Sequence, residues 1–207
     1  MGSSPTRLTT PLLPHTTARH PALDHADHVG LLRGGVPAAR PDSGYWADLG
    51  SGTGAFTLAL ADLLGPGGRI VSVDRDAAAL RDQATAMAAR FPSVSLDQRV
   101  ADFTTDLGLP PLDGVVMANA LHFQRDRGAV ARHVRDMLRS GGRLVLVEYD
   151  ADHGNPWVPY PLSFETWRRV AANAGLEEPR LLGRVPSRFL GAIYSAVSEA
   201  LGSTSAD

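Results

Sequence analysis

The chain has 207 residues, a formal net charge of −2 and no cysteine, which excludes disulfides, thiolate metal sites and cysteine nucleophiles. It has no long block of like charge, which argues against a nucleic-acid partner, and no apolar run of about 18 residues that could cross a membrane. We therefore expect a cytoplasmic protein with a disordered tail at residues 1–20 and a single domain at residues 21–200.

The first expected element is a short helix from Leu23 to Leu32, placed to act as a lid over the edge of a sheet. His20, His25 and His28 lie in or near it and raise a second interpretation, a metal site. Neither cysteine nor a second histidine pair at metal spacing completes a ligand set, so the sequence predicts no metal.

A buried strand, Tyr45 to Leu49, leads into a helix from Ala55 to Leu64. The turn between them consists of Gly50, Ser51, Gly52, Thr53 and Gly54. Glycines let a backbone adopt positive φ and lie against a ligand, and the helix that follows presents unpaired amides. About 20 residues later, a second strand, Arg69 to Asp74, ends in a carboxylate that can reach a ribose diol, and Arg75 follows it. Together these features predict a nucleotide-type cofactor site.

The rest of the chain continues this alternation. Further helices are expected at Ala77 to Arg90, Arg127 to Leu138 and Ser163 to Ala174, and further strands at Val94 to Val100, Gly114 to Ala118, Arg143 to Glu148, Arg180 to Val185 and Phe189 to Val197. The last two form a hairpin. The pattern predicts an α/β fold with a doubly wound, mostly parallel seven-stranded sheet, a C-terminal antiparallel hairpin and a short N-terminal helical lid.

Three motifs in combination resemble the class I S-adenosylmethionine (SAM) dependent methyltransferases. They are Asp48-Leu49-Gly50-x-Gly52-x-Gly54, then Val100-Ala101-Asp102-Phe103, and then the segment from Gly114 to Phe123 with the strand that ends at Tyr149. The resemblance extends from Leu31 to Ser198. It implies SAM as cofactor and S-adenosylhomocysteine as product.

The resemblance also implies roles for individual residues. Asp48 is expected near the methionine amino group, Asp74 on the ribose, and Asp102 with Phe103 at the adenine. The expected cofactor set is completed by Gly50, Ser51, Gly52, Thr53, Gly54, Arg75 and Asn119, of which Asn119 also shapes the methyl-transfer pocket.

Catalysis needs a base only where the acceptor must lose a proton. His122 is the first candidate because it follows the fourth strand at the carboxyl edge of the sheet, and imidazole exchanges protons near neutral pH. A histidine that only packs against the next turn is an equal alternative. Tyr149, and then Asp150, follow as candidates after the fifth strand.

The sequence thus predicts a methyltransferase that acts on a small molecule by in-line displacement, with an acceptor pocket that a second subunit could complete. Two alternatives stay open. A SAM-binding module without catalysis would share every cofactor motif. An NAD(P)-dependent oxidoreductase fits the looser glycine pattern that ends at Ala55, but the predicted hairpin and the absence of any lysine for a Tyr-x-x-x-Lys pair argue against it.

Overall fold

The computed structural model describes residues 22–38, 44–187 and 189–202, so the tail expected at residues 1–20 lies outside the described part. The helices are α1 (His25–Leu32), α2 (Ala55–Leu64), α3 (Ala77–Arg90), α4 (Arg127–Met137) and α5 (Phe164–Asn173), with a 3-10 turn η1 (Leu121–Phe123). The strands are β1 (Tyr45–Leu49), β2 (Arg69–Asp74), β3 (Ser95–Val100), β4 (Leu112–Ala118), β5 (Leu138–Tyr149), β6 (Arg180–Pro186) and β7 (Ala192–Glu199).

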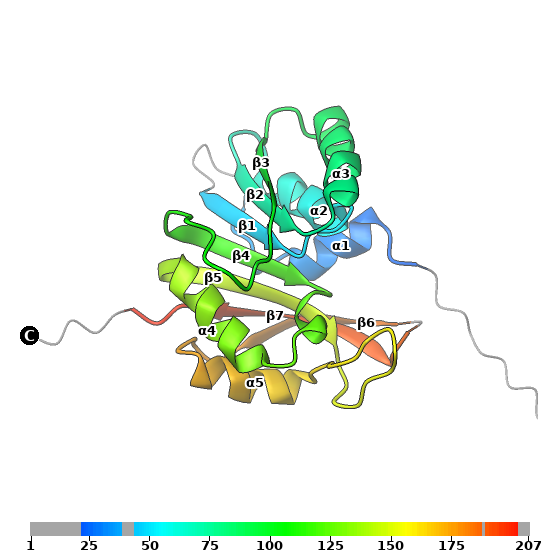
Figure 1. Cartoon of the computed structure of the whole chain (residues 1–207), viewed down its shortest axis with the longest axis vertical. Coiled ribbons are helices and arrows are strands. Elements are labelled where there is room, and N and C mark those ends of the chain that lie inside the picture. Colours follow the sequence, from blue (N-terminus) through cyan, green and yellow to red (C-terminus); the bar gives the residue numbers. More distant parts are fainter. Residues whose placement is uncertain (1–21, 39–43, 188, 203–207) are drawn as a thin grey trace, which may run out of the picture.

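The strands form a seven-stranded sheet in the order β3-β2-β1-β4-β5-β7-β6 (Figure 1). Neighbours from β3 to β5 are parallel, and β7 is antiparallel to both β5 and β6. The predicted fold class is confirmed. The strand order reverses between β1 and β4, and open α/β sheets bind ligands beyond the carboxyl ends of the strands at such a point.

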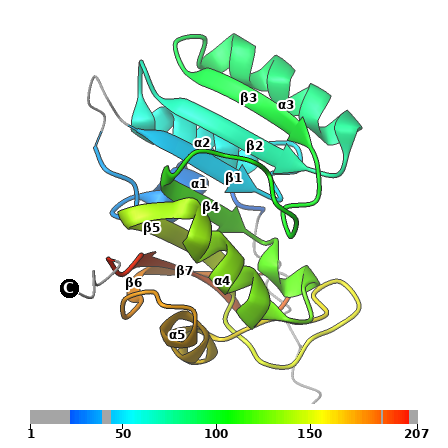
Figure 2. The ribbon, with the colours of Figure 1, turned by 60° about the vertical axis from the view of Figure 1, so that its left-hand side comes forward.

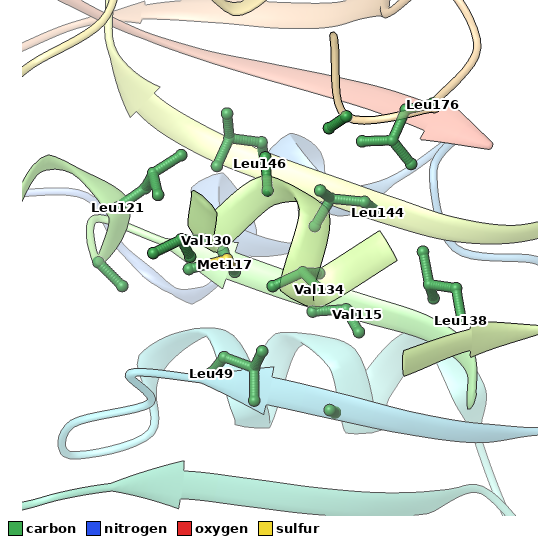
Figure 3. Packing of buried hydrophobic residues seen from close by; sticks show 14 of the residues in the cluster. Leu49, Val115, Met117, Leu121, Val130, Val134, Leu138, Leu144, Leu146 and Leu176 are labelled. Carbon is green, nitrogen blue, oxygen red and sulfur yellow. The ribbon is translucent and has the colours of Figure 1, made fainter. Parts of the chain in front are cut away.

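Helices cover both faces of the sheet: α4 and α5 lie on one face, and α1, α2 and α3 on the other (Figures 1 and 2). Alternate side chains of the buried strands divide between the two faces because successive residues of a strand point to opposite sides. In β4, Val115 and Met117 pack in the cluster that includes Val130 and Val134 of α4 (Figure 3), whereas Val116 belongs to the opposite cluster.

Several boundaries differ from those expected. β5 begins at Leu138 rather than Arg143, because Leu138 already pairs with Leu112 of β4. The hairpin turn is longer than expected, since β7 begins at Ala192 rather than Phe189.

The helix expected from Leu23 begins at His25 because Asp24 forms a capping box with Asp27. Along its length, α1 is packed against α2 with Val29, Leu31 and Leu32 buried. The carboxy-terminal residues of the expected lid are therefore part of the core, whereas the residues before Val29 lie nearer the surface, and Leu23 and His28 border a cavity. None of the described helices is long and apolar enough to cross a membrane.

Candidate active site

The turn after β1 holds its glycines in left-handed conformations. Gly50 has a φ of 75° and Gly54 a φ of 91°. A Cβ on Gly50 would lie 2.6 Å from the Cβ of Ala120, so only glycine fits. The amide of Gly52 donates to Oδ2 of Asp74 at 2.8 Å. The two parts of the predicted nucleotide site, the turn and the acid at the end of β2, are thus in contact at the amino-terminus of α2.

A cavity of about 210 Å³, called here the cofactor cavity, opens over this turn. It is lined by Gly50, Asp74, Arg75, Phe103, Asn119, Ala120, Phe123 and Gln124. Ala120, Phe123 and Gln124 are not in the predicted cofactor set. They lie in and around η1, directly after β4, and hydrophobic pattern alone does not show that this segment turns back over the glycine turn.

Two buried polar atoms at this site have no hydrogen-bond partner: Oγ of Ser51 and Oδ1 of Asn119. Asn119 also has a φ of 53°, the one positive φ outside glycine in the described ranges. Buried polar atoms are normally hydrogen-bonded, and strained backbone tends to occur at functional sites. Both atoms fit a site whose remaining hydrogen bonds are made by a ligand.

Asp48 lies beneath the turn rather than in the cavity wall. It is 1% exposed, and its Oδ2 accepts a hydrogen bond from Oγ1 of Thr57 at 2.5 Å. Burial raises the pKa of Asp48 to about 7, the charge of Asp74 adds to the rise, and the Thr57 hydrogen bond opposes it. A carboxyl group with this pKa gains a full charge readily when a cation comes near.

A buried polar network supports Asp48 from behind. Thr57 accepts a hydrogen bond from Nε2 of Gln83 at 2.8 Å, and Oε1 of Gln83 accepts from Ser72 at 2.5 Å and from Gln98 at 2.6 Å. The network joins the cofactor turn to α3, β2 and β3. Sequence reasoning missed it because a glutamine within a helix is typical of a solvent-facing position.

Asp102 lies after β3 and is not among the residues that line the cofactor cavity, although its neighbour Phe103 is. Hydrogen bonds from the amide and hydroxyl of Thr104 lower the pKa of Asp102, and Arg75, at 3.5 Å, lowers it further. Thr53 is exposed and also lies outside the cavity lining.

His122 lies just past β4 and is 3% exposed. Its Nδ1 is 2.9 Å from Oε2 of Glu148, and its backbone amide donates to Oε1 of the same carboxyl group at 3.1 Å. The pair forms because β4 and β5 are parallel neighbours, with Ala118 paired with Val147. Glu148 was not predicted, although the adjacency of these two strand ends is the signal that could have found it.

Tyr149 packs edge-on against the imidazole of His122, with ring centroids 5.3 Å apart. It also lines a second cavity of about 140 Å³, which has Asn119 in common with the cofactor cavity. The structure therefore brings together Asn119, His122 and Tyr149 beside the predicted cofactor site. Asp150 is engaged elsewhere: its carboxylate accepts from Arg184 at 2.7 Å and from the amide of Phe164 at 2.9 Å.

The described N-terminal histidines have contacts other than with a metal. Nε2 of His25 lies 3.1 Å from Oδ2 of Asp62, and His28 packs edge-on against Phe56 with ring centroids 4.7 Å apart. His20 lies outside the described residues. Within residues 22–38, 44–187 and 189–202, no three potential ligands are grouped closely enough to hold a metal ion.

A family model described as a methyltransferase domain matches residues 47–144. The match runs from β1 into β5 and includes the glycine turn, Asp74 and His122. These residues are similar to a methyltransferase domain, and the resemblance to the class I SAM-dependent methyltransferases that the sequence predicts is confirmed, with SAM as the methyl donor.

Among curated relatives of this methyltransferase, the reducing polyketide synthase grgA of a Penicillium species is 32% identical over 110 residues. The match covers 51% of this chain and 4% of that protein, so the chain spans only a small part of the synthase.

Solved structures show the same fold at low sequence identity. The 1,6-didemethyltoxoflavin-N1-methyltransferase of Burkholderia thailandensis, with S-adenosylhomocysteine bound, has a TM-score of 0.68 at 16% identity, over 86% of this chain and 78% of that one. The CurJ carbon methyltransferase has a TM-score of 0.63 at 21% identity, over 83% of this chain and 51% of that one.

Proposed function

We propose that the protein methylates a small-molecule acceptor whose nucleophilic atom must first lose a proton. The observation that carries this proposal is the buried pair of His122 and Glu148 beside the cofactor cavity. When bound, SAM supplies a methyl group on a sulfonium sulfur, which a hydroxyl or an acidic C–H attacks well only after deprotonation.

The residues of the cofactor cavity fit SAM. Asp74 offers a carboxylate to the ribose hydroxyls while its other contacts hold the glycine turn, and Phe103 offers an apolar face for adenine. Asp48 lies beneath the glycine turn and outside the cavity wall, and it would gain its charge if the methionine ammonium came close to this turn. Oδ1 of Asn119 accepts a hydrogen bond that the protein itself does not supply.

Glu148 orients His122 for proton transfer. Its two oxygens engage Nδ1 and the backbone amide of the same histidine, which fixes both the ring position and the proton on Nδ1. Nε2 is then the nitrogen with a lone pair for the acceptor's proton. This is the arrangement of a general base with an orienting carboxylate.

The relatives support a small-molecule acceptor. The Burkholderia enzyme is named for methylation of 1,6-didemethyltoxoflavin, CurJ is a carbon methyltransferase, and grgA is a polyketide synthase.

The test is incubation of the protein with methyl-labelled SAM and separate panels of phenols, 1,3-dicarbonyl compounds and amines. Formation of labelled product from either acidic panel supports the proposal. Turnover with amines alone contradicts the need for a base. Tight binding of SAM with no turnover on a full metabolite extract favours the alternative, a SAM-binding module without catalysis.

A further inference from the structure

Strand β3 forms one edge of the sheet, with α3 beside it (Figure 2). The amide of Ser95 donates to the carbonyl of Gly68, just before β2, at 2.8 Å, and the backbone groups of successive strand residues point in opposite directions. The residues whose N–H and C=O groups point away from β2 are Leu96, Gln98 and Val100. No strand of the described residues pairs with this outer edge, and an unpaired edge is a template for a strand of another chain.

The two faces of β3 differ in chemistry. On one face Nε of Arg99 lies 3.2 Å from Oδ2 of Asp97, and these side chains are 37% and 53% exposed. Alternation along the strand places Leu96, Gln98 and Val100 on the other face. This is the face toward α3, since Nε2 of Gln98 donates to the backbone of that helix at 2.7 Å. Val100 on this face is 62% exposed, which is unusual for a large apolar side chain within a strand.

The charges select one register for a second copy of β3. Two copies of one strand pair antiparallel about a two-fold axis, with outward residues opposite outward residues. An axis at Asp97 would place two aspartates opposite each other, and an axis at Arg99 would do the same with two arginines. Like charges directly opposite are destabilising. An axis at Gln98 instead places Asp97 of each copy opposite Arg99 of the other, so β3 is self-complementary in charge in this register.

The apolar side chains agree with the same register. An axis at Gln98 places Leu96 opposite Val100 of the second copy. Leu96 also lines a groove of about 370 Å³ between β3 and α3, whose α3 side includes the small side chains of Ala84 and Ala88. A two-fold axis perpendicular to the sheet keeps both copies of α3 on the same face. Val100 of the second copy therefore loses its exposure beside this groove, where α3 presents little steric obstacle.

We propose that β3 pairs with β3 of a second copy of this chain, antiparallel and centred on Gln98, so that two sheets become one. Gln98 exchanges both of its outward hydrogen bonds with Gln98 of the second copy, and Leu96 does so with Val100. An interface of one short strand and one groove is small, so the dimer forms and separates with protein concentration. The proposal concerns assembly and does not rest on the proposed function.

The test is sedimentation velocity of the full chain between about 1 and about 100 µM. The unmodified protein is expected to shift from one chain to two as concentration rises. Asp97→Arg gives β3 two arginines and Arg99→Asp gives it two aspartates. Each variant alone should dimerise at least about tenfold more weakly, because like charges lie opposite in the homodimer. Mixed in equal amounts, the two variants should form dimers again, since the opposite charges are then restored across the interface.

Asp136→Arg is the matched control: it reverses an exposed carboxylate that pairs with a neighbouring arginine on α4, and should dimerise like the unmodified protein. Urea midpoints show that each variant is folded. Should a charge variant fail to fold, Val100→Pro is the second probe. It removes an outward N–H and leaves the β2 ladder intact, so it should weaken the dimer at least about tenfold.

Three results would overturn the proposal. One is an unmodified protein that is a single chain at every concentration, which would mean that Asp97 and Arg99 only protect the edge or that it pairs with a different protein. The second is a dimer that neither the charge variants nor Val100→Pro weakens, which would place the contact elsewhere. The third is a mixture of the two folded charge variants that stays monomeric, which would exclude the register centred on Gln98.

Discussion

Nδ1 of His122 and Oε2 of Glu148 lie 2.9 Å apart where the two side chains are 3% and 0% exposed. The amide of Tyr149 donates to the same carboxyl oxygen at 3.3 Å, and the amide of His122 donates to the other oxygen. A buried carboxylate needs such donors. The contact therefore fixes the histidine in one orientation and one tautomer.

Glu148→Gln should lower turnover by about 10² to 10⁴ while the protein stays folded. The amide oxygen of glutamine can still accept from the His122 backbone, but its NH₂ group faces Nδ1 and forces the proton onto Nε2. That tautomer cannot accept the acceptor's proton. Rates of S-adenosylhomocysteine formation measure the effect, with the exposed Glu178→Gln as control. A Glu148→Gln enzyme of normal rate would contradict the role given to His122.

Asp74→Ala should weaken S-adenosylhomocysteine binding by roughly 10- to 100-fold, since each hydrogen bond to a charged group contributes about 1.5 to 3 kcal/mol. It also removes the acceptor for the Gly52 amide. The matched control is Asp76→Ala, which removes the cap of α3 and should lower the free energy of unfolding without changing the affinity for S-adenosylhomocysteine. Equal affinities in the two variants would mean that Asp74 does not bind the ribose.

Asp48 should make stability depend on pH. Its pKa is about 7 in the folded protein against 3.8 ordinarily, so between these values the folded protein keeps a proton that the unfolded chain has released. Its contribution to the free energy of unfolding is full below about pH 4 and falls as pH rises to about 7. The side chain in Asp48→Asn carries no ionisable group. The free energy of unfolding of this variant should therefore rise relative to that of the unmodified protein by roughly 2 to 4 kcal/mol as the pH increases from about 4 to about 7.

Urea unfolding at pH 5 and pH 8 measures this gain, and Asp82→Asn, an exposed change on α3, should show none. Parallel pH profiles for Asp48→Asn and the unmodified protein would show that burial does not keep Asp48 neutral.

Gln83→Leu should lower the free energy of unfolding by about 2 kcal/mol or more, because Ser72 and Gln98 lose their shared acceptor within the protein. Arg81→Leu, an exposed change on the same helix, is the control and should be nearly neutral. Urea midpoints compare the two. If both variants unfold at the same midpoint as the unmodified protein, the network behind the cofactor turn does not contribute to stability.

Sequence alone could predict the alternation of helices and strands, the glycine turn and the acid after β2, because these depend on local periodicity and short spacings. The contact of Glu148 with His122 was not predicted, because it depends on β4 and β5 ending side by side, and this neighbour relationship was the signal that could have indicated it. Sequence alone could not predict that Gln83 is buried, because that depends on which face of α3 meets Ser72 and Thr57. Contacts between side chains of different helices and strands can be predicted only when the three-dimensional arrangement of those elements is known.

The most direct test of the account is calorimetric titration of the unmodified protein with S-adenosylhomocysteine, SAM, NAD and NADP under one set of conditions. We predict that S-adenosylhomocysteine and SAM bind with one site per chain and that neither dinucleotide binds with comparable affinity. Strong binding of NAD or NADP, with no heat from SAM or S-adenosylhomocysteine, would contradict the assignment of the cofactor cavity and with it the proposed methyl transfer.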